Sequence, residues 1–260
     1  MEKKEPIIKV ENLVAGYGDT VILENISFNV YPGEIFVILG GSGCGKSTLL
    51  KHIIGLIPPI SGVITIDGDM VTEDDEGTFK RIIRKIGVLY QSGALLGSMT
   101  IGENIALPIT EYAGLEPESV DRIVRMKLKL VGLEGFEHHL PSEISGGMKK
   151  RAGLARAMAL NPAILMFDEP SAGLDPVTSA GLDELILNLN SILGTTMVVV
   201  THELSSIFTI ADRIIMLDRK TKSIIADGDP RYLRDNSTDP YVREFFNPVK
   251  EKRVKGQERE

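Results

Sequence analysis

The chain of 260 residues contains the stretch Ile35-Phe36-Val37-Ile38-Leu39-Gly40-Gly41-Ser42-Gly43-Cys44-Gly45-Lys46-Ser47-Thr48. Its five apolar residues predict a buried strand, and the residues from Lys46 to Ile54 predict a helix. The turn between them fits the phosphate-binding pattern G-x-x-x-x-G-K-[ST]. The order of strand, loop and helix favours this interpretation over an ordinary glycine-rich turn.

The residue types in this turn suit the binding of phosphate groups. Glycines let backbone N–H groups approach phosphate oxygens, and the N-terminus of the following helix adds positive potential. Lys46 can bridge the β- and γ-phosphates of a nucleotide, and Ser47 can ligate Mg²⁺. The candidate phosphate-binding residues are Gly40, Gly41, Ser42, Gly43, Cys44, Gly45, Lys46, Ser47 and Thr48.

Composition narrows the class of protein. The chain is 43% hydrophobic and 25% charged, which suits one globular unit with a large core. No apolar run approaches the 18 or so residues that cross a bilayer, and the charged start Met1–Glu5 predicts no signal peptide. The single cysteine, Cys44, cannot form an intrachain disulfide and favours a reducing cytoplasm. The net charge of −7 argues against broad nucleic-acid binding.

Apolar runs alternate with helical patterns along the chain. From Ser92 to about Leu160 the pattern is helical with Gly and Pro breaks, and it lies between groups of predicted strands. This arrangement predicts an α/β core that carries a smaller helical lobe. The predicted strands are Ile7–Val14, Val21–Val30, Ile35–Leu39, Gly62–Ile66, Ile86–Tyr90, Ile164–Phe167, Met197–Val200, Ile214–Leu217 and Ile224–Asp227.

Further motifs follow the phosphate-binding turn in a fixed order. Gln91 follows a short strand, Ser145–Arg151 reads S-G-G-M-K-K-R, Ile164–Glu169 is an apolar strand that ends in two carboxylates, and Val198–His202 is a strand that ends in a histidine. In this order the motifs resemble those of the ATP-binding-cassette (ABC) ATPases, and the resemblance runs from about Ile8 to about Tyr232.

The resemblance implies a fold, a domain organisation and an activity. It implies a P-loop NTPase (RecA-like) core with an antiparallel β subdomain and a helical subdomain at about residues 93–160. The ATPase domain would span residues 1–230, and residues 231–260 would be a C-terminal extension with a charged tail. The implied activity is ATP hydrolysis, with ATP and Mg²⁺ as the bound groups.

The resemblance also implies roles for four residues around the phosphates. Asp168 would help to hold Mg²⁺ together with Ser47 and Gln91, and Gln91 would also be a catalytic residue that reaches the attacking water. Glu169 would be the catalytic base that orients and deprotonates the attacking water, and His202 would contact the γ-phosphate. Alternatives stay open for each of these residues. Asp168 and Glu169 could be an exposed acidic pair after a strand, His202 could be a structural histidine, and Gln91 could be an ordinary polar loop residue.

Other matching residues lie further from the phosphates in the sequence. Tyr17, between two glycines, matches the aromatic residue that stacks on adenine, although a plain turn tyrosine stays an alternative. Ser145, Gly146 and Gly147 match the family signature, which faces the ATP of a second subunit. Asp175 lies in a loop that matches the one crossing the same interface. The resemblance therefore implies a head-to-tail homodimer around two ATP molecules.

Two departures from the common pattern indicate a subgroup. Met148 stands where most members carry glutamine, and Ile144 stands where they carry leucine. The amino-acid sequences of Gly87–Pro108 and Asp239–Phe246 are also similar to those of Mla/Mce-type lipid-transport ATPases. This similarity implies a subunit on the cytoplasmic side of a bacterial inner membrane, docked to a separate integral-membrane permease. The implied further partners are an MCE-domain lipid-binding protein and a STAS-domain protein, and the implied cargo is phospholipid.

Several rival functions stay open at this point. The first is an ATPase for another permease, such as a small-solute importer or a lipoprotein extractor. The second is a mechanical regulator that uses the same dimer cycle without moving cargo. The third is a DNA-repair or translation ATPase. It is disfavoured because the chain has neither a long coiled-coil insertion nor a second cassette, and because its net charge is negative.

The docking surface for the permease can also be predicted. Leu95, Leu96, Met99 and Ile101 follow Gln91 closely, and we expect these apolar residues to be partly exposed and to contact the permease. Burial in the helical lobe's own core is the alternative. The charge run Lys250–Glu260 predicts a solvated or disordered end.

Overall fold

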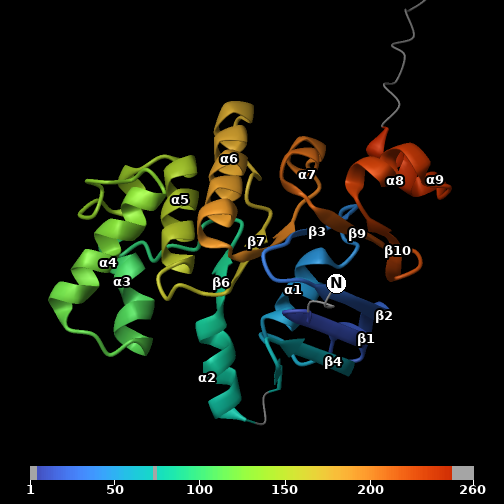
Figure 1. Cartoon of the computed structure of the whole chain (residues 1–260), viewed down its shortest axis with the longest axis horizontal. Helices are drawn as coiled ribbons and strands as arrows, with labels where there is room; N and C mark the ends of the chain where they lie inside the picture. Colours follow the sequence, from blue (N-terminus) through green and yellow to red (C-terminus); the bar gives the residue numbers. More distant parts are fainter. Residues whose placement is uncertain (1–4, 73–74, 248–260) are drawn as a thin grey trace, which may run out of the picture.

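Two sheets and two groups of helices build the molecule (Figure 1). The computed structural model describes residues 5–72 and 75–247. The first sheet is antiparallel, in the order β2-β1-β4-β5. Its strands are β1 (Ile8–Tyr17), β2 (Thr20–Val30), β4 (Ser61–Ile66) and β5 (Asp69–Met70).

The second sheet forms the centre of the molecule. Its order is β10-β9-β3-β8-β7-β6, and all neighbouring pairs are parallel except β10 and β9. Parallel order brings the carboxyl ends of β3, β7 and β8 to one edge, where α/β folds place ligand groups. The strands are β3 (Ile35–Gly40), β6 (Ile86–Leu89), β7 (Ile164–Asp168), β8 (Thr196–Val200), β9 (Arg213–Asp218) and β10 (Ser223–Gly228).

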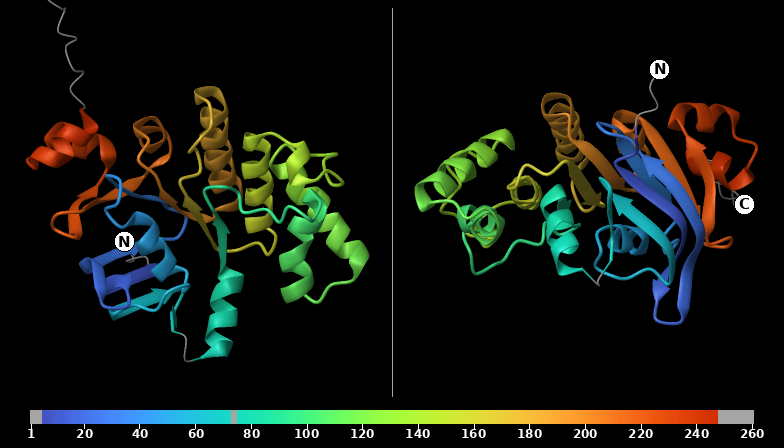
Figure 2. Two further views of the ribbon diagram at one scale, coloured as in Figure 1. Left: turned by 180° about the vertical axis from the view of Figure 1, so that it is seen from behind. Right: turned by 60° about the horizontal axis from the view of Figure 1, so that its bottom comes forward.

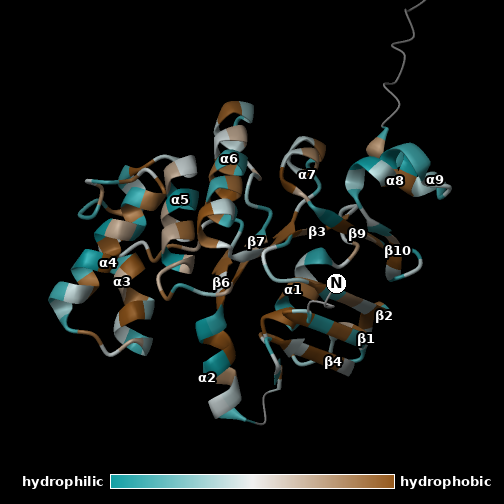
Figure 3. Cartoon of the chain, in the orientation of Figure 1, coloured by the Kyte–Doolittle hydropathy of each residue, from teal (hydrophilic) through white to brown (hydrophobic). Residues whose placement is uncertain are grey.

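The inner strands of this sheet are apolar because both of their faces are covered. Every residue of β3 and β8 is buried. Alternate side chains enter two separate cores: Phe36 and Ile38 join the core under the antiparallel sheet, whereas Val37 and Leu39 join the core under the helices. In Figure 3 helix α2 alternates between hydrophobic and hydrophilic colours, which is the pattern of a helix with one covered face.

The helices divide into a core group and a lobe. In both views of Figure 2, α3, α4 and α5 lie together, on the side of the central sheet away from the antiparallel strands. Helix α1 instead packs between the two sheets, with Leu49, Leu50 and Ile53 buried there. The helices are α1 (Lys46–Ile53), α2 (Glu76–Lys85), α3 (Ile101–Tyr112), α4 (Pro117–Leu130), α5 (Gly146–Ala157), α6 (Pro176–Leu193), α7 (Leu204–Ile210), α8 (Pro230–Asn236) and α9 (Pro240–Phe246).

The predicted α/β class, with an antiparallel β part and a helical part, is confirmed by this architecture. The predicted strands are all present, with ends that shift by one to three residues. Helices α2, α6 and α7 were not predicted. A capping signal marks α6, because Asp175 accepts from the N–H groups of Val177 and Thr178 and Gly194 ends the helix in the left-handed region.

The segment after Pro230 differs from a simple polar tail. It forms α8 and α9, and Val242 and Phe246 are buried in the core that also holds α7. The predicted charge run Lys250–Glu260 lies outside the described residues. Within residues 5–72 and 75–247, no helix combines the length and apolar character needed to cross a membrane.

Candidate functional site

A cleft opens at the carboxyl edge of the central sheet. Its volume is about 660 Å³, and the phosphate-binding turn forms one side of it. Gly40 has φ 148°, and a Cβ there would lie 2.5 Å from the Leu217 carbonyl oxygen, so only glycine fits beside β9. The cleft is lined by Ile22, Gly40, Gly41, Ser42, Gly43, Gly45, Lys46, Ser47, Thr48, Gln91, Glu169, His202 and Phe245.

Lys46 extends its ammonium group along the turn. Its Nζ donates to the carbonyl oxygens of Gly40 at 2.9 Å and Gly41 at 3.2 Å, and it lies 3.9 Å from Glu169 Oε1. The side chain is nearly buried, so its charge acts in a partly desolvated space. A cation in this place can contact phosphate oxygens and the carboxylate on the facing strand end.

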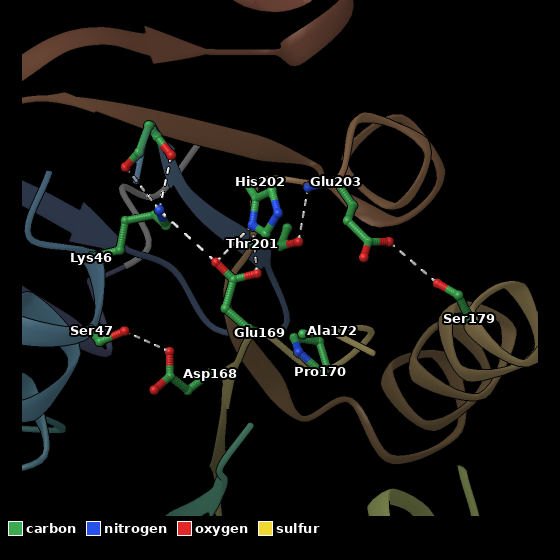
Figure 4. Close-up of polar contacts among 12 residues, drawn as sticks. Lys46, Ser47, Asp168, Glu169, Pro170, Ala172, Ser179, Thr201, His202 and Glu203 are labelled. Carbon is green, nitrogen blue, oxygen red and sulfur yellow. Dashed lines mark hydrogen bonds and ion pairs between the residues drawn. The ribbon is translucent and has the colours of Figure 1, made fainter. Parts of the chain in front are cut away.

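Ser47 and Asp168 meet across the cleft. The Ser47 hydroxyl donates to Asp168 Oδ1 at 2.9 Å, which joins the start of α1 to the end of β7 (Figure 4). Gln91, at the end of the neighbouring strand, lines the same cleft. Hydroxyl, carboxylate and amide oxygens are ligands that Mg²⁺ prefers, so the three residues predicted as metal ligands fit that ion. Among the described residues, no group of three or more His, Cys, Asp or Glu side chains is placed to hold a metal.

Glu169 and His202 form a pair at the ends of β7 and β8. The Nδ1 atom of His202 lies 2.9 and 3.0 Å from the two carboxylate oxygens of Glu169 (Figure 4). Glu169 has φ 49°, a left-handed backbone that a non-glycine residue rarely adopts. Its N–H donates to the Val200 carbonyl oxygen at 2.9 Å, which holds the strained residue against β8.

Lys150 is a contributor that the sequence analysis missed. It is buried on α5, and its Nζ donates to the carbonyl oxygens of Pro170 at 2.5 Å, Ala172 at 2.6 Å and Glu169 at 3.4 Å. Burial lowers the pKa of its ammonium group. The side chain therefore ties the signature helix to the loop that carries Glu169. Lys150 lies in the basic run Lys149-Lys150-Arg151 of α5, so no local pattern distinguished it from its neighbours.

Gln91 begins a loop that is held by its neighbours. Arg156 on α5 donates to the carbonyl oxygens of Gly93 at 3.0 Å and Ala94 at 2.7 Å. Buried Asn104 contacts the backbone of Leu96 through both its oxygen and its nitrogen. The loop thus connects the cleft to the helical lobe through a series of hydrogen bonds.

Tyr17 lies beside helix α1 at the end of β1. Its ring is 45% exposed, and the Lys51 ammonium lies 5.8 Å from the ring centroid. A hydrogen bond with the Thr48 side chain lowers the pKa of the Tyr17 hydroxyl. Tyr17 is not among the residues that line the cleft, but it presents an open ring next to the helix that begins at Lys46.

The signature residues form a separate group on the same chain. Ser145 caps α5 by accepting from the Met148 N–H, and Asp175 caps α6. A Cβ on Gly147 would lie 2.6 Å from Thr178 Cγ2, so the starts of α5 and α6 are in contact. Ser145, Gly146, Gly147 and Asp175 do not line the cleft. The structure therefore brings the predicted residues together as two groups.

The expectation about the apolar residues after Gln91 is only partly met. Leu96 is 44% exposed, whereas Leu95 is partly buried against the core of the lobe. Ile101 is completely buried, so its predicted exposure was wrong. The capping box at Thr100 and Glu103 turns Ile101 inward at the start of α3.

Comparisons with known proteins agree with this geometry. The family described as ABC transporter matches residues 23–172. The chain is 43% identical over 240 residues to the probable ribonucleotide transport ATP-binding protein mkl of Mycobacterium leprae, covering 92% of this chain and 68% of that protein. It is 42% identical over 233 residues to MlaF, the intermembrane phospholipid transport system ATP-binding protein of Escherichia coli K12, covering 89% of this chain and 85% of that protein.

A solved structure shows the same fold. It is a dimeric ATP-binding cassette in a post-hydrolysis state, bound to ADP and Pi. It is 33% identical to this chain, with a TM-score of 0.77, and the match covers 85% of this chain and 98% of that one.

Proposed function

Because this chain belongs to the ABC transporter family and is an ATPase, we propose that it powers a membrane transporter whose cargo is phospholipid. The observation that carries the catalytic part is the arrangement at one cleft of the phosphate-binding turn, the Ser47–Asp168 contact and the Glu169–His202 pair. Each of these groups has a distinct task in the hydrolysis of ATP.

The phosphates bind along the turn. Backbone N–H groups of Gly43 to Thr48 and the Lys46 ammonium hold the β- and γ-phosphates, with the N-terminus of α1 below them. Ser47, Asp168 and Gln91 are the residues that would hold Mg²⁺, which when bound neutralises phosphate charge. The exposed ring of Tyr17 is the surface on which we place adenine.

The attacking water is oriented by the facing strand ends. Glu169 accepts a hydrogen bond from this water and takes its proton as the water oxygen bonds to the γ-phosphorus. The bond between that phosphorus and the bridging oxygen breaks, and ADP leaves. With both ring nitrogens protonated, His202 donates from Nδ1 to the Glu169 carboxylate and from its other ring nitrogen to the γ-phosphate. The left-handed backbone of Glu169 aims the carboxylate into the cleft.

A complete site needs a second copy of the chain. Ser145, Gly146 and Gly147 start a helix whose N–H groups can bind phosphate, but they lie away from the cleft of their own chain. A head-to-tail homodimer places the signature of one chain over the ATP of the other, with Asp175 at the same interface. Closing and opening of this dimer is the mechanical step.

The permease docks beside the loop that starts at Gln91. An apolar groove of about 430 Å³ lies between α2, β6, α3 and the end of α5. Tyr90 lines this groove, and the next residue, Gln91, lines the nucleotide cleft. A short cytoplasmic helix of the permease in this groove would therefore be linked, through Tyr90 and Gln91, to the presence of the γ-phosphate in the cleft. This placement puts the subunit on the cytoplasmic side of a bacterial inner membrane.

The phospholipid cargo is supported by the similarity to MlaF and by the signature sequence Ser145–Arg151, which resembles that of the lipid-transport subgroup. The further partners that we propose are an MCE-domain lipid-binding protein and a STAS-domain protein. The mycobacterial relative favours a second candidate cargo, a ribonucleotide, because its name assigns that transport and it matches 92% of this chain. The chain spans about two thirds of that relative's length, 68%.

Reconstitution separates the two cargoes. The ATPase and its co-purified permease are placed in liposomes, and ATP-dependent transfer of a fluorescent phospholipid and of a labelled ribonucleotide is measured. We expect lipid transfer that needs ATP and Mg²⁺ and that stops in the Lys46→Ala variant. Ribonucleotide movement with no lipid transfer would overturn the assignment of cargo while leaving the ATPase in place.

A further inference from the structure

Helix α9, near the end of the described chain, lies against the phosphate-binding turn. Tyr241 and Phe245 stand one helical turn apart on this helix. Phe245 lines the nucleotide cleft, and the Tyr241 hydroxyl contacts Gly41. Two side chains from a segment some 200 residues away in the sequence therefore form part of the nucleotide site.

The Tyr241 hydroxyl lies in the space that a side chain at position 41 would occupy. A Cβ on Gly41 would lie 2.7 Å from Tyr241 Oη, which is shorter than real Cβ contacts, but 4.0 Å from Tyr241 Cζ, which is ordinary van der Waals contact. Gly41 is not among the glycines with positive φ, so its backbone tolerates other residues. The phosphate-binding pattern also leaves this position variable. The tyrosine hydroxyl, and not the backbone, is the group that a side chain at position 41 would meet.

Helix α9 is anchored in the core that also holds α7. Val242 is fully buried, Phe246 is 4% exposed, and the Phe246 ring lies 5.6 Å from the ring of Phe208 on α7. Burial raises the pKa of Tyr241, whereas a hydrogen bond with the Gly41 backbone lowers it, so the hydroxyl stays protonated and in contact. Helix α7 begins two residues after His202. Phe208 and Phe246 therefore connect α9 to α7, the helix that follows His202 in the chain.

We propose that α9 is the C-terminal wall of the nucleotide site, in which Tyr241 positions the phosphate-binding turn through Gly41 and Phe245 closes the cleft. This inference rests on the proposed function of the cleft as an ATP site. Docking of α9 and binding of nucleotide then stabilise each other. Both favour the same conformation of the phosphate-binding turn, so each raises the equilibrium constant of the other by the same factor.

A suppressor experiment tests the contact directly. Gly41→Ala adds a methyl group against the Tyr241 hydroxyl, and Tyr241→Phe removes only that hydroxyl. Affinity for ADP, and for ATP in EDTA so that hydrolysis is blocked, is measured by calorimetry in both single variants and the double variant. We expect Gly41→Ala to weaken binding about fivefold or more in the wild-type background, the effect of one lost interaction of ordinary strength.

In the Tyr241→Phe background the same Gly41→Ala change should cost less than about twofold, because the steric conflict is gone. Tyr232→Phe on α8, a tyrosine that is 64% exposed, is the matched control and should bind both nucleotides like wild type. Equal losses from Gly41→Ala in both backgrounds would overturn the proposal, since the loop alone would then be responsible.

A second readout does not depend on affinity. Hydrogen exchange of residues 240–246 should slow when ADP is added, and the protection should fall in Tyr241→Phe. Unchanged exchange on nucleotide binding would also overturn the proposal. If the wild-type chain binds neither ADP nor ATP, the assignment of the cleft fails instead, so the two failures are distinguishable.

Discussion

At the scale of single residues, Glu169 is the group on which the chemistry of the cleft converges. Its carboxylate contacts His202, lies near Lys46, and is carried on a strained backbone. Lys150 holds the following carbonyl groups in place. Substitutions at Glu169 and at Lys150 test these two roles.

Glu169→Gln tests the general base. The amide keeps the shape of the side chain but cannot take a proton, so turnover should fall by about 10²-fold or more. ATP binding should persist, and the variant should accumulate as an ATP-bound dimer. Hydrolysis by the purified complex and size-exclusion chromatography with ATP are the measurements, with Lys46→Ala as the control that weakens binding itself. Near-normal turnover would remove Glu169 from this role.

Lys150→Met tests the tie between α5 and the catalytic loop. Methionine keeps much of the length of the side chain but leaves three carbonyl oxygens without this donor. We expect kcat to fall about tenfold while KM for ATP changes little, because the phosphate-binding turn is not touched. Lys150→Arg, which keeps the charge and the donors, should recover much of kcat. An unchanged kcat in Lys150→Met would show that the tie has no catalytic effect.

At the scale of elements, we expect the loop from Gln91 to α3 to present a surface to a partner. Asn104 fixes the backbone of this loop, so the exposed Leu96 side chain is not needed for its shape. The contact between α6 and α7 contains a different feature, a buried carboxylate. Each element supports one prediction.

Leu96→Asp should disrupt docking without unfolding the subunit. The melting temperature and ATP binding of the isolated chain should stay near wild type, whereas co-purification with the permease should be lost. Ile192→Asp, at an exposed apolar residue near the end of α6 and away from the groove, is the matched control and should keep the complex. A large drop in the melting temperature of Leu96→Asp with an intact complex would contradict this placement of the docking surface.

Asp183 makes the stability of the α6–α7 contact depend on pH. It is 5% exposed, Oδ2 accepts from Ser206 at 2.7 Å, and Oδ1 has no hydrogen-bond partner among the described residues. Burial raises the pKa of this carboxyl, so its ionisation costs stability as the pH rises above the ordinary range of an aspartate.

Asp183→Asn removes this cost. Near pH 8 the melting temperature should rise by about 2–4 °C, roughly 1 kcal/mol for a chain of this size. Near pH 4, close to the ordinary pKa of an aspartate, most of this gain should disappear. Calorimetry at the two pH values gives the answer, with exposed Asp121→Asn as the control. A gain that is equal at both pH values would show that ionisation is not its cause.

At the scale of the whole molecule, the separation of the site residues into two groups is the basis on which we propose a site shared by two chains. Lys46 lies in the cleft, whereas Ser145 lies at the start of α5 away from it. A site shared between copies therefore combines Lys46 of one chain with Ser145 of the other.

Mixed dimers of Lys46→Ala and Ser145→Arg chains test this sharing. Such a dimer has one site with both lesions and one site with neither. If the two sites hydrolyse ATP independently, the mixture should recover activity that neither variant has alone. Crosslinking between cysteines placed at Ser145 and Gly43 on different chains checks the geometry. Crosslinks without recovery indicate obligatory coupling, whereas the absence of both contradicts a shared site.

The motifs of the cleft could be predicted from the sequence because each is local. The turn at Gly40–Ser47 and the strand that ends in Asp168 and Glu169 depend on residue types at a fixed spacing. Helices α2 and α6 have local signals that were overlooked, the N-caps at Asp75 and Asp175, whereas α7 is a helix of seven residues without a side-chain cap. The exposure of Leu96 and the burial of Ile101 also depend on the surroundings, here on Asn104 and the capping box at Thr100.

The sequence by itself determined the α/β class, the nucleotide chemistry and the order of the strands along the chain. Only the tertiary structure decided that Lys150 holds the loop after Glu169 and that Tyr241 contacts Gly41. The physical reason is the range of the interactions. Backbone conformation and phosphate-binding turns arise from neighbours in sequence, whereas a buried lysine or a tyrosine hydroxyl acquires its role from groups that packing brings together across 20 to 200 residues.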